Sequence, residues 1–175
     1  MPRNLLTQIE IIRLQRLLPI VRNNHNQLSI ENAPPTKSAG FYWIYTNYSQ
    51  PDFEQQTGPA CKNAVDIGLL SRLHCGLANT CKIHTEGFRL VYNGIAGIGT
   101  GLRERIHQHF NGGNGTGSLA ILRTNLNDLE RWRVSYVTIE TPNKAPDVTA
   151  QYDAVAGHVE RMWRLEYGWP ILCTQ

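Results

Sequence analysis

The sequence predicts an α+β domain in which a small three-stranded sheet is flanked by helices. Residues 40–46, 88–96 and 134–140 are rich in aromatic and β-branched residues, which is typical of strands. Helical periodicity recurs before, between and after these segments. A chain of 175 residues is long enough for one hydrophobic core, so we expect residues 1–175 to form a single domain. Strands and helices in this order fit a sheet with helices on its faces.

A helix is predicted ahead of the first strand. Apolar residues recur at helical spacing through residues 4–22, and Pro19 would break or kink this helix near its end. Residues 23–39 are polar and contain Pro34-Pro35, which predicts a loop. We therefore expect residues 1–39 to form a helical extension and linker. Its helix would pack on the core or contact a second copy of the chain.

The remaining segments predict further helices and loops. Residues 47–87 form an irregular insertion between the first two strands, with one short helix at 62–73. Three more helices are expected, over residues 102–110, 118–132 and about 147–167. A Gly-rich loop at 112–117 separates the first two of them, and Gly168 with Pro170 would end the last.

Composition and charge narrow the range of functions. The formal net charge is +3, and arginine makes up most of the 17 basic residues, which favours phosphate recognition or reflects GC-rich codons. The N-terminal segment is too interrupted by charge to be a signal peptide or a membrane span. We therefore expect a cytoplasmic protein with reduced cysteines and no membrane partner.

Five polar side chains fall at positions that the predicted elements would bring together. Tyr42 and Tyr92 lie on the first two strands, which would pair. Arg105 and His109 are four residues apart and share one helix face, and Glu160 lies on the last helix. Phosphodiester hydrolysis needs a proton acceptor for water, a cation for the phosphate charge and stabilisation of the leaving oxygen. Each residue alone is ordinary, but together they supply these groups.

In this order the residues resemble the motifs of the GIY-YIG nuclease superfamily. Gly40-Phe41-Tyr42 is similar to the GIY element, and Tyr92-Asn93-Gly94 to the YIG element. Leu102-Arg103-Glu104-Arg105-Ile106 with His109 resembles the helix motif, in which Arg105 rather than Arg103 matches the catalytic arginine. Glu160, ten residues before Pro170, resembles the metal-binding glutamate. The resemblance covers residues 40–46 and 88–173.

The resemblance implies a three-stranded antiparallel sheet and a metal-dependent DNA endonuclease. By this likeness Glu160 would bind Mg²⁺ or Mn²⁺, with Glu166 as the alternative ligand. Arg105 would stabilise the charge on the scissile phosphate. Tyr42 or Tyr92 would accept the proton of the attacking water, and His109 would hydrogen-bond to this group or relay the proton.

The chain departs from the family pattern at several positions. Asn93 replaces the usual apolar residue of YIG, and Ile95 stands where many members carry lysine. Cys173 lies near the position of a frequent asparagine, and the spacer between Tyr42 and Tyr92 is long. These departures affect the detailed mechanism more than the reaction class.

The resemblance is greatest to stand-alone type II restriction endonucleases. It implies cleavage of double-stranded DNA at a specific sequence, by a homodimer if the site is symmetric. The alternatives are a phage or mobile-element nicking endonuclease and a catalytically inactive DNA-binding protein on the same fold. Further phosphate contacts are expected from arginines near the site, namely Arg103, Arg123, Arg161 and Arg164.

The insertion contains a second set of candidate metal ligands. Five residues separate Cys75 from Cys81, and two residues separate Cys81 from His84. His74 or Cys61 could supply a fourth ligand for structural Zn²⁺. The spacing is not one of the strong zinc-finger patterns. The alternative is a loop with reduced cysteines and solvated or capping histidines.

Overall fold

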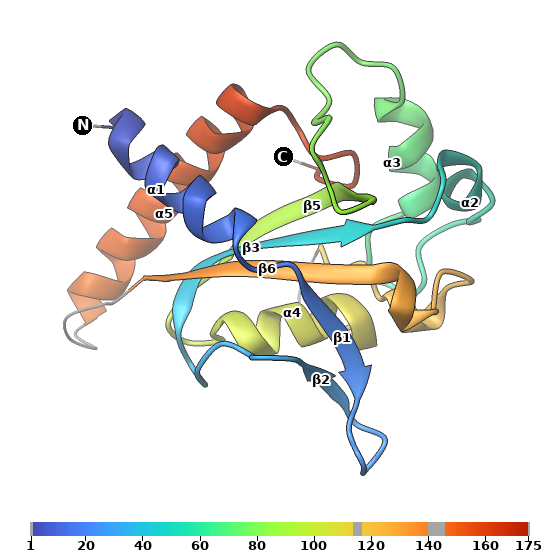
Figure 1. The fold of residues 1–175 in the computed structure, drawn as a ribbon, viewed down its shortest axis with the longest axis horizontal. Helices are drawn as coiled ribbons and strands as arrows, with labels where there is room; N and C mark the ends of the chain where they lie inside the picture. The colour runs from blue at the N-terminus through green and yellow to red at the C-terminus, as the bar shows by residue number, and fades with distance from the viewer. Residues whose placement is uncertain (1, 114–116, 140–145, 175) are drawn as a thin grey trace.

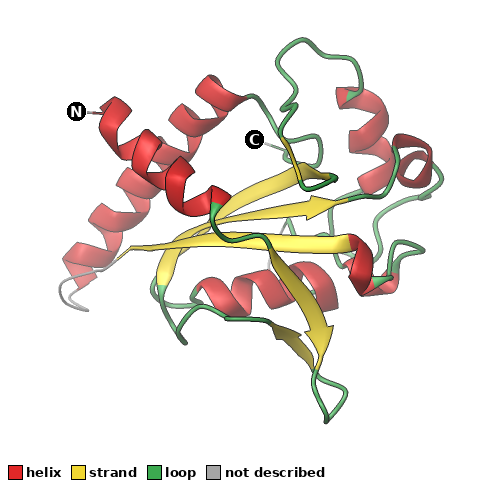
Figure 2. Ribbon diagram, viewed as in Figure 1, coloured by secondary structure: helices red, strands yellow, loops and turns green. Residues whose placement is uncertain are grey.

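A six-stranded antiparallel sheet forms the centre of the protein (Figure 1, Figure 2). The structure is a computed structural model and describes residues 2–113, 117–139 and 146–174. The strand order is β2-β1-β6-β3-β5-β4. The strands are β1 (Leu18–Arg22), β2 (Leu28–Ile30), β3 (Ala39–Thr46), β4 (His84–Thr85), β5 (Phe88–Ala96) and β6 (Trp132–Ile139). The α+β class is confirmed, whereas the expected three-stranded sheet is wrong.

Helices cover both faces of this sheet. They are α1 (Pro2–Leu14), α2 (Gln50–Glu54), α3 (Ile67–His74), α4 (Leu102–Asn111) and α5 (Pro146–Tyr167), with 3₁₀ turns η1 (Ile121–Arg123) and η2 (Leu129–Arg131). The α4 helix packs on one face, and α1 and α5 pack together on the other (Figure 1). Among the described residues, none of the helices combines the length and apolar character that a membrane crossing requires.

The β3 strand is buried along its whole length because it lies between these two layers. Tyr42 and Ile44 belong to the core under α4, whereas Phe41, Trp43 and Tyr45 belong to the core under α1 and α5. An almost continuous run of aromatic and β-branched residues is expected for a strand covered on both sides.

The elements that carry the predicted site residues are confirmed. The strands expected at 40–46 and 88–96 and the helix at 102–110 correspond to β3, β5 and α4. Within α4, Leu102, Ile106 and Phe110 recur every fourth residue and are fully buried, so this face holds the helix on the sheet. The insertion helix starts at Ile67 rather than at residue 62, because the Asp66 side chain caps it by accepting the N–H of Leu69 at 2.9 Å.

The N-terminal prediction is wrong beyond Leu14, where α1 ends. Residues 18–22 and 28–30 form a β-hairpin instead of helix and loop, and β1 pairs with β6. Ile20 and Ile30 are buried cross-strand partners in the core under α4. The turn is stabilised by the Asn23 side chain, which accepts the N–H groups of His25 and Gln27 at 2.9 Å.

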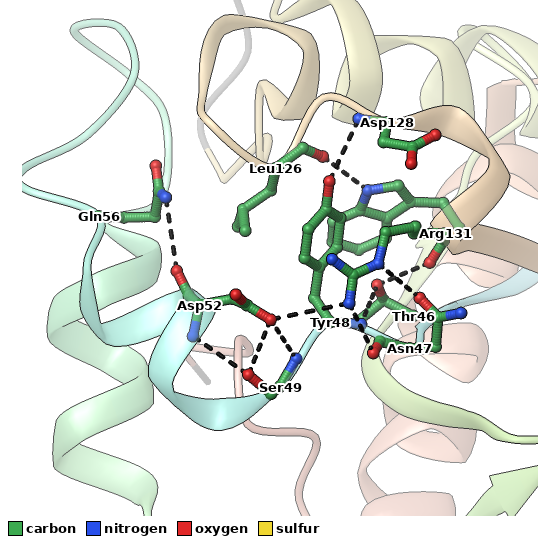
Figure 3. Close-up of polar contacts among 10 residues, drawn as sticks. Thr46, Asn47, Tyr48, Ser49, Asp52, Gln56, Leu126, Asp128 and Arg131 are labelled. Carbon is green, nitrogen blue, oxygen red and sulfur yellow. Dashed lines mark hydrogen bonds and ion pairs between the residues drawn. The ribbon is translucent and has the colours of Figure 1, made fainter.

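The helix predicted at 118–132 is also wrong, because this segment forms two 3₁₀ turns joined by irregular chain. Leu119 and Leu126 are buried and Leu122 and Leu129 are partly buried, but polar groups hold the backbone in turns (Figure 3). Trp132 Nε1 donates to the carbonyl of Leu126 at 2.8 Å, and the Tyr48 hydroxyl accepts the N–H of Asp128 at 3.3 Å. The Arg131 guanidinium lies 3.7 Å from the Tyr48 ring centroid and donates to Asn47 Oδ1 at 2.9 Å.

Candidate active site

The pairing of β3 with β5 places Tyr42 directly opposite Gly94. The Tyr42 ring lies across this glycine so closely that a methyl group at residue 94 would sit 2.6 Å from Cζ of Tyr42. Only a residue without a side chain leaves this space. Gly40, at the start of β3, is required for a similar reason, because a methyl group there would collide with the Val137 carbonyl on β6.

Three rings meet beside Gly94. Tyr92 lies on the same sheet face as Tyr42, and their ring centroids are 6.2 Å apart. The His109 ring, on α4, is 4.5 Å from that of Tyr92 and 5.4 Å from that of Tyr42. The Tyr42 hydroxyl lies 2.7 Å from His109 Nε2. Both strands and α4 therefore converge on one hydroxyl group.

The hydrogen bonds of His109 determine which ring nitrogen carries the proton. The backbone N–H of Leu119 donates to Nδ1 at 3.3 Å, so Nδ1 is an acceptor. Burial, with a smaller effect of Arg105, lowers the pKa of His109 well below its usual value, and the ring is neutral. The single proton of a neutral imidazole is then on Nε2, which donates to the Tyr42 oxygen.

A cleft with a volume of about 400 Å³ opens next to these rings. Its lining residues are Tyr42, Tyr92, Gly94, Ile95, Arg105, Gly117, Glu160, Arg164, Cys173 and Thr174. The structure thus brings four of the five predicted side chains into one cleft. The fifth, His109, is completely buried behind Tyr42.

Arg105 and Glu160 reach this cleft from opposite faces of the sheet. Arg105 is on α4, and Glu160 is on α5, which packs on the other face. The β4 strand pairs with β5 as far as Arg89, and the Leu172 N–H of the C-terminal segment donates to the Val91 carbonyl. Beyond these contacts, Gly94 and Ile95 of β5 line the cleft together with Arg105 and Glu160.

Arg164 lines the cleft and is paired with other residues of the protein. We predicted a contact with DNA phosphate, but this side chain is buried and paired within the protein. Its Nη2 lies 2.9 Å from Glu160 Oε1, its Nε donates to Asn93 Oδ1 at 2.9 Å, and its guanidinium lies 4.7 Å from the Trp169 ring centroid. The asparagine that departs from the YIG pattern therefore serves to fix the arginine that holds Glu160.

Burial also shifts the ionisation of the groups that line the cleft. It raises the pKa of Glu160, although Arg164 and Arg161 oppose the shift. It raises the pKa of Tyr42 well above the usual value and raises that of Tyr92, with Arg105 acting in the opposite direction on both. Both tyrosines are therefore protonated at neutral pH.

The donor set fits a magnesium ion bound through one carboxylate. Mg²⁺ commonly keeps several water ligands and binds through one or two carboxylates and substrate phosphate oxygens. Glu160 supplies one such carboxylate in a cleft with room for water. Glu166, the alternative ligand, is exposed and does not line this cleft.

The predicted zinc site receives no support from the arrangement of its residues. Within the described part of the chain, no three His, Cys, Asp or Glu side chains gather closely enough to hold a metal ion. His74 Nδ1 is 2.8 Å from the Ile171 carbonyl, and His84 Nδ1 is 3.0 Å from the Lys82 carbonyl. Among the cysteines, Cys61 is partly exposed, Cys75 is exposed and Cys81 is buried. A zinc ion in this insertion stays a prediction.

The other three arginines predicted to contact phosphate lie outside the cleft lining. Arg103 Nε donates to the Pro34 carbonyl at 3.0 Å. Arg123 is exposed beside Gly112, and Arg161 is exposed on α5 with Nε 3.0 Å from the Gly157 carbonyl. Their role in DNA binding stays a prediction.

Comparison with known proteins identified no relative of this chain. No family model matches the chain, and neither a curated protein nor a solved structure matches it.

Proposed function

We propose that this protein is a metal-dependent endonuclease that hydrolyses phosphodiester bonds in double-stranded DNA. One observation carries the proposal: two tyrosine hydroxyls, the Arg105 guanidinium and the Glu160 carboxylate line a single cleft, although they come from four separate elements. A proton acceptor, a fixed cation and a metal ligand are the groups that phosphodiester hydrolysis requires.

Tyr42 is the better candidate for the proton acceptor, because of its hydrogen bonds. His109 Nε2–H donates to the Tyr42 oxygen at 2.7 Å, and such a bond stabilises the deprotonated tyrosine. The Tyr92 hydroxyl instead donates to the Gly117 carbonyl at 3.3 Å, which favours its protonated form. We therefore assign the activation of water to Tyr42. The role of Tyr92 is to pack against the Tyr42 ring.

The remaining groups act on the phosphate. Arg105 donates to the non-bridging oxygens and stabilises the charge that develops on them. A divalent cation, when bound, supplies a second positive charge there and makes water more acidic. Glu160 would hold that cation through its carboxylate, whose position Arg164 fixes by an ion pair with Oε1.

We further propose that cleavage is sequence-specific, as in a type II restriction endonuclease that acts as a homodimer. Digestion of a long DNA to discrete bands is the expected result. A smear would identify a non-specific nuclease, and accumulation of open circles without linear DNA would identify a nicking enzyme.

Plasmid cleavage in Mg²⁺ tests the proposed function. We expect the wild-type protein to convert supercoiled DNA to nicked and linear forms, and Glu160→Gln to reduce the rate on the order of 10²–10³-fold. Glu166→Gln is the matched control, since it removes an exposed carboxylate on the same helix. Equal cleavage by wild type and Glu160→Gln, or no cleavage by any of the three proteins, would refute the proposal.

A further inference from the structure

A second hollow lies beside the first half of β5 and is lined by the insertion. We call it the insertion hollow, and its volume is about 340 Å³. Lys82, His84 and Arg89 line it together with apolar residues such as Leu77 and Ile171. Its described lining contains no aspartate or glutamate. The insertion hollow therefore carries positive charge without an acidic partner.

Arg89 has hydrogen-bonding capacity that the protein leaves unused. Its Nη1 donates to Gln50 Oε1 at 3.3 Å, and its guanidinium lies 5.2 Å from the Phe53 ring centroid. Its Nη2 is buried and has no hydrogen-bond partner among the described residues. Burial of a cationic donor without a partner costs free energy, and an anion that enters beside the guanidinium would relieve this cost.

A β-bulge places Arg89 on the sheet face that carries Tyr92. In the pairing of β3 with β5, Ile44 is opposite Tyr92 and Tyr45 is opposite Leu90, so Val91 is the extra residue. This one-residue shift puts Arg89 on the same sheet face as Tyr92. Three residues of strand span about 10 Å, which is the rise of about three base pairs.

A small third hollow adjoins both the active-site cleft and the insertion hollow. It is lined by His74, Leu77, Thr80 and Thr174, among others. It shares Thr174 with the active-site cleft and shares Leu77 and Thr80 with the insertion hollow. The insertion hollow therefore lies near the cleft, within reach of the same DNA backbone.

We propose that the insertion hollow binds a backbone phosphate of the DNA, about three nucleotides from the scissile phosphate, through Arg89 and Lys82. The identity of the ligand as DNA rests on the proposed function. The insertion thereby extends the DNA-binding surface beyond the cleft.

The salt dependence of DNA binding tests this proposal. Affinity for a labelled duplex is measured by fluorescence anisotropy over a series of salt concentrations, without Mg²⁺ and with every protein carrying Glu160→Gln. Arg89→Gln and Lys82→Gln should each weaken binding and reduce the slope of log K against log salt by about 0.9, the value for one lost phosphate contact. Arg22→Gln, at the opposite end of the sheet, should leave the slope unchanged.

Several results would overturn the proposal. One is a slope of log K against log salt that equals the wild-type slope in both Arg89→Gln and Lys82→Gln. Lys82 is exposed, so we expect its substitution to leave the fold intact. Another is a calorimetry experiment in which inorganic phosphate binds the wild type but not Arg89→Gln, while DNA binds both equally well. That result would make the insertion hollow a site for free anions. Cleavage by the wild type together with unaltered slopes in the two variants refutes only this inference. Reduced slopes together with a wild type that does not cut DNA refute only the proposed function.

Discussion

The hydroxyl of Tyr42 lies 2.7 Å from Nε2 of His109, and the backbone N–H of Leu119 occupies the other ring nitrogen. This arrangement makes His109 a donor to Tyr42 and not the acceptor of its proton. Without a bound substrate and cation, Tyr42 keeps its proton at neutral pH because burial raises its pKa. The proton that leaves Tyr42 must therefore leave through the cleft.

The pH dependence of cleavage should follow the deprotonation of Tyr42. Below the pKa of a general base, the deprotonated fraction rises tenfold for each pH unit, so the single-turnover rate should rise by up to about tenfold per unit from about pH 6 to 9. His109 stays neutral over this range because its pKa is lowered. A rate that reaches a plateau just above pH 6.5, the usual pKa of histidine, would instead identify His109 as the titrating base.

Gly94→Ala should damage both stability and catalysis. The added methyl group would displace the Tyr42 ring, at a cost of about 1–3 kcal/mol for overpacking of a buried site. The free energy of unfolding is measured in urea. Gly99→Ala is the control, because a methyl group at that position meets no atom within 4 Å. Equal stability of the two variants would mean that Tyr42 does not lie across Gly94.

Glu160 should make the stability of the metal-free protein depend on pH. Because burial raises its pKa, the folded protein binds this proton more tightly than the unfolded chain does. The free energy of unfolding should therefore fall as the pH rises from about 4.5 through the folded-state pKa. Urea denaturation in EDTA should show this fall in the wild type relative to Glu160→Gln, which cannot ionise. Parallel curves for the two proteins would contradict the shift.

Divalent cations should reverse this loss of stability. A ligand that binds only the folded state stabilises it by mass action, so Mg²⁺ or Mn²⁺ should raise the melting temperature of the wild type. Glu160→Gln should show no such increase, and Glu166→Gln should behave like the wild type. An equal increase in all three proteins would place the cation elsewhere.

A buried ion pair between Glu10 and Arg13 lies within α1 and is linked to α5 by Trp163. Arg13 Nη2 lies 2.6 Å from Glu10 Oε2, and Trp163 Nε1 donates to Glu10 Oε1 at 2.6 Å. Arg13→Met should destabilise the protein by about 3–5 kcal/mol because it leaves Glu10 buried and unpaired. The double variant with Glu10→Gln should lose less, since the amide still accepts from Trp163. A loss below about 1 kcal/mol in Arg13→Met would show that the pair contributes little.

The elements that carry the site could be predicted because their signals are local. The aromatic run of β3 and the four-residue spacing in α4 each indicate one structure only. The β1–β2 hairpin could not be predicted in this way, since Leu18 and Ile20 continue the helical pattern of α1. Their strand conformation depends on pairing with β6, which is distant in the sequence. The helix predicted from the leucines at 118–132 was wrong for the same reason. Contacts with Tyr48 and Asn47, which are distant in the sequence, hold this segment in turns.

The site itself was predictable in part. Motif order indicated Tyr42, Tyr92, Arg105 and Glu160, which the structure brings into one cleft. The spacing of Glu160 and Arg164, four residues apart on a helix, was a readable signal for their ion pair. The burial of Arg164 against Asn93 was not, because it depends on how α5 packs beside β5.

Arg105 permits the most direct test of whether Arg105 and Glu160 act on one scissile phosphate. Single-turnover cleavage with Mg²⁺ and saturating protein compares Arg105→Gln with Arg22→Gln, which lies on β1 away from the cleft and donates to the Asn26 carbonyl. Arg105→Gln should slow cleavage on the order of 10²–10³-fold, while Arg22→Gln should cut at nearly the wild-type rate. Equal rates for the two variants would contradict the account.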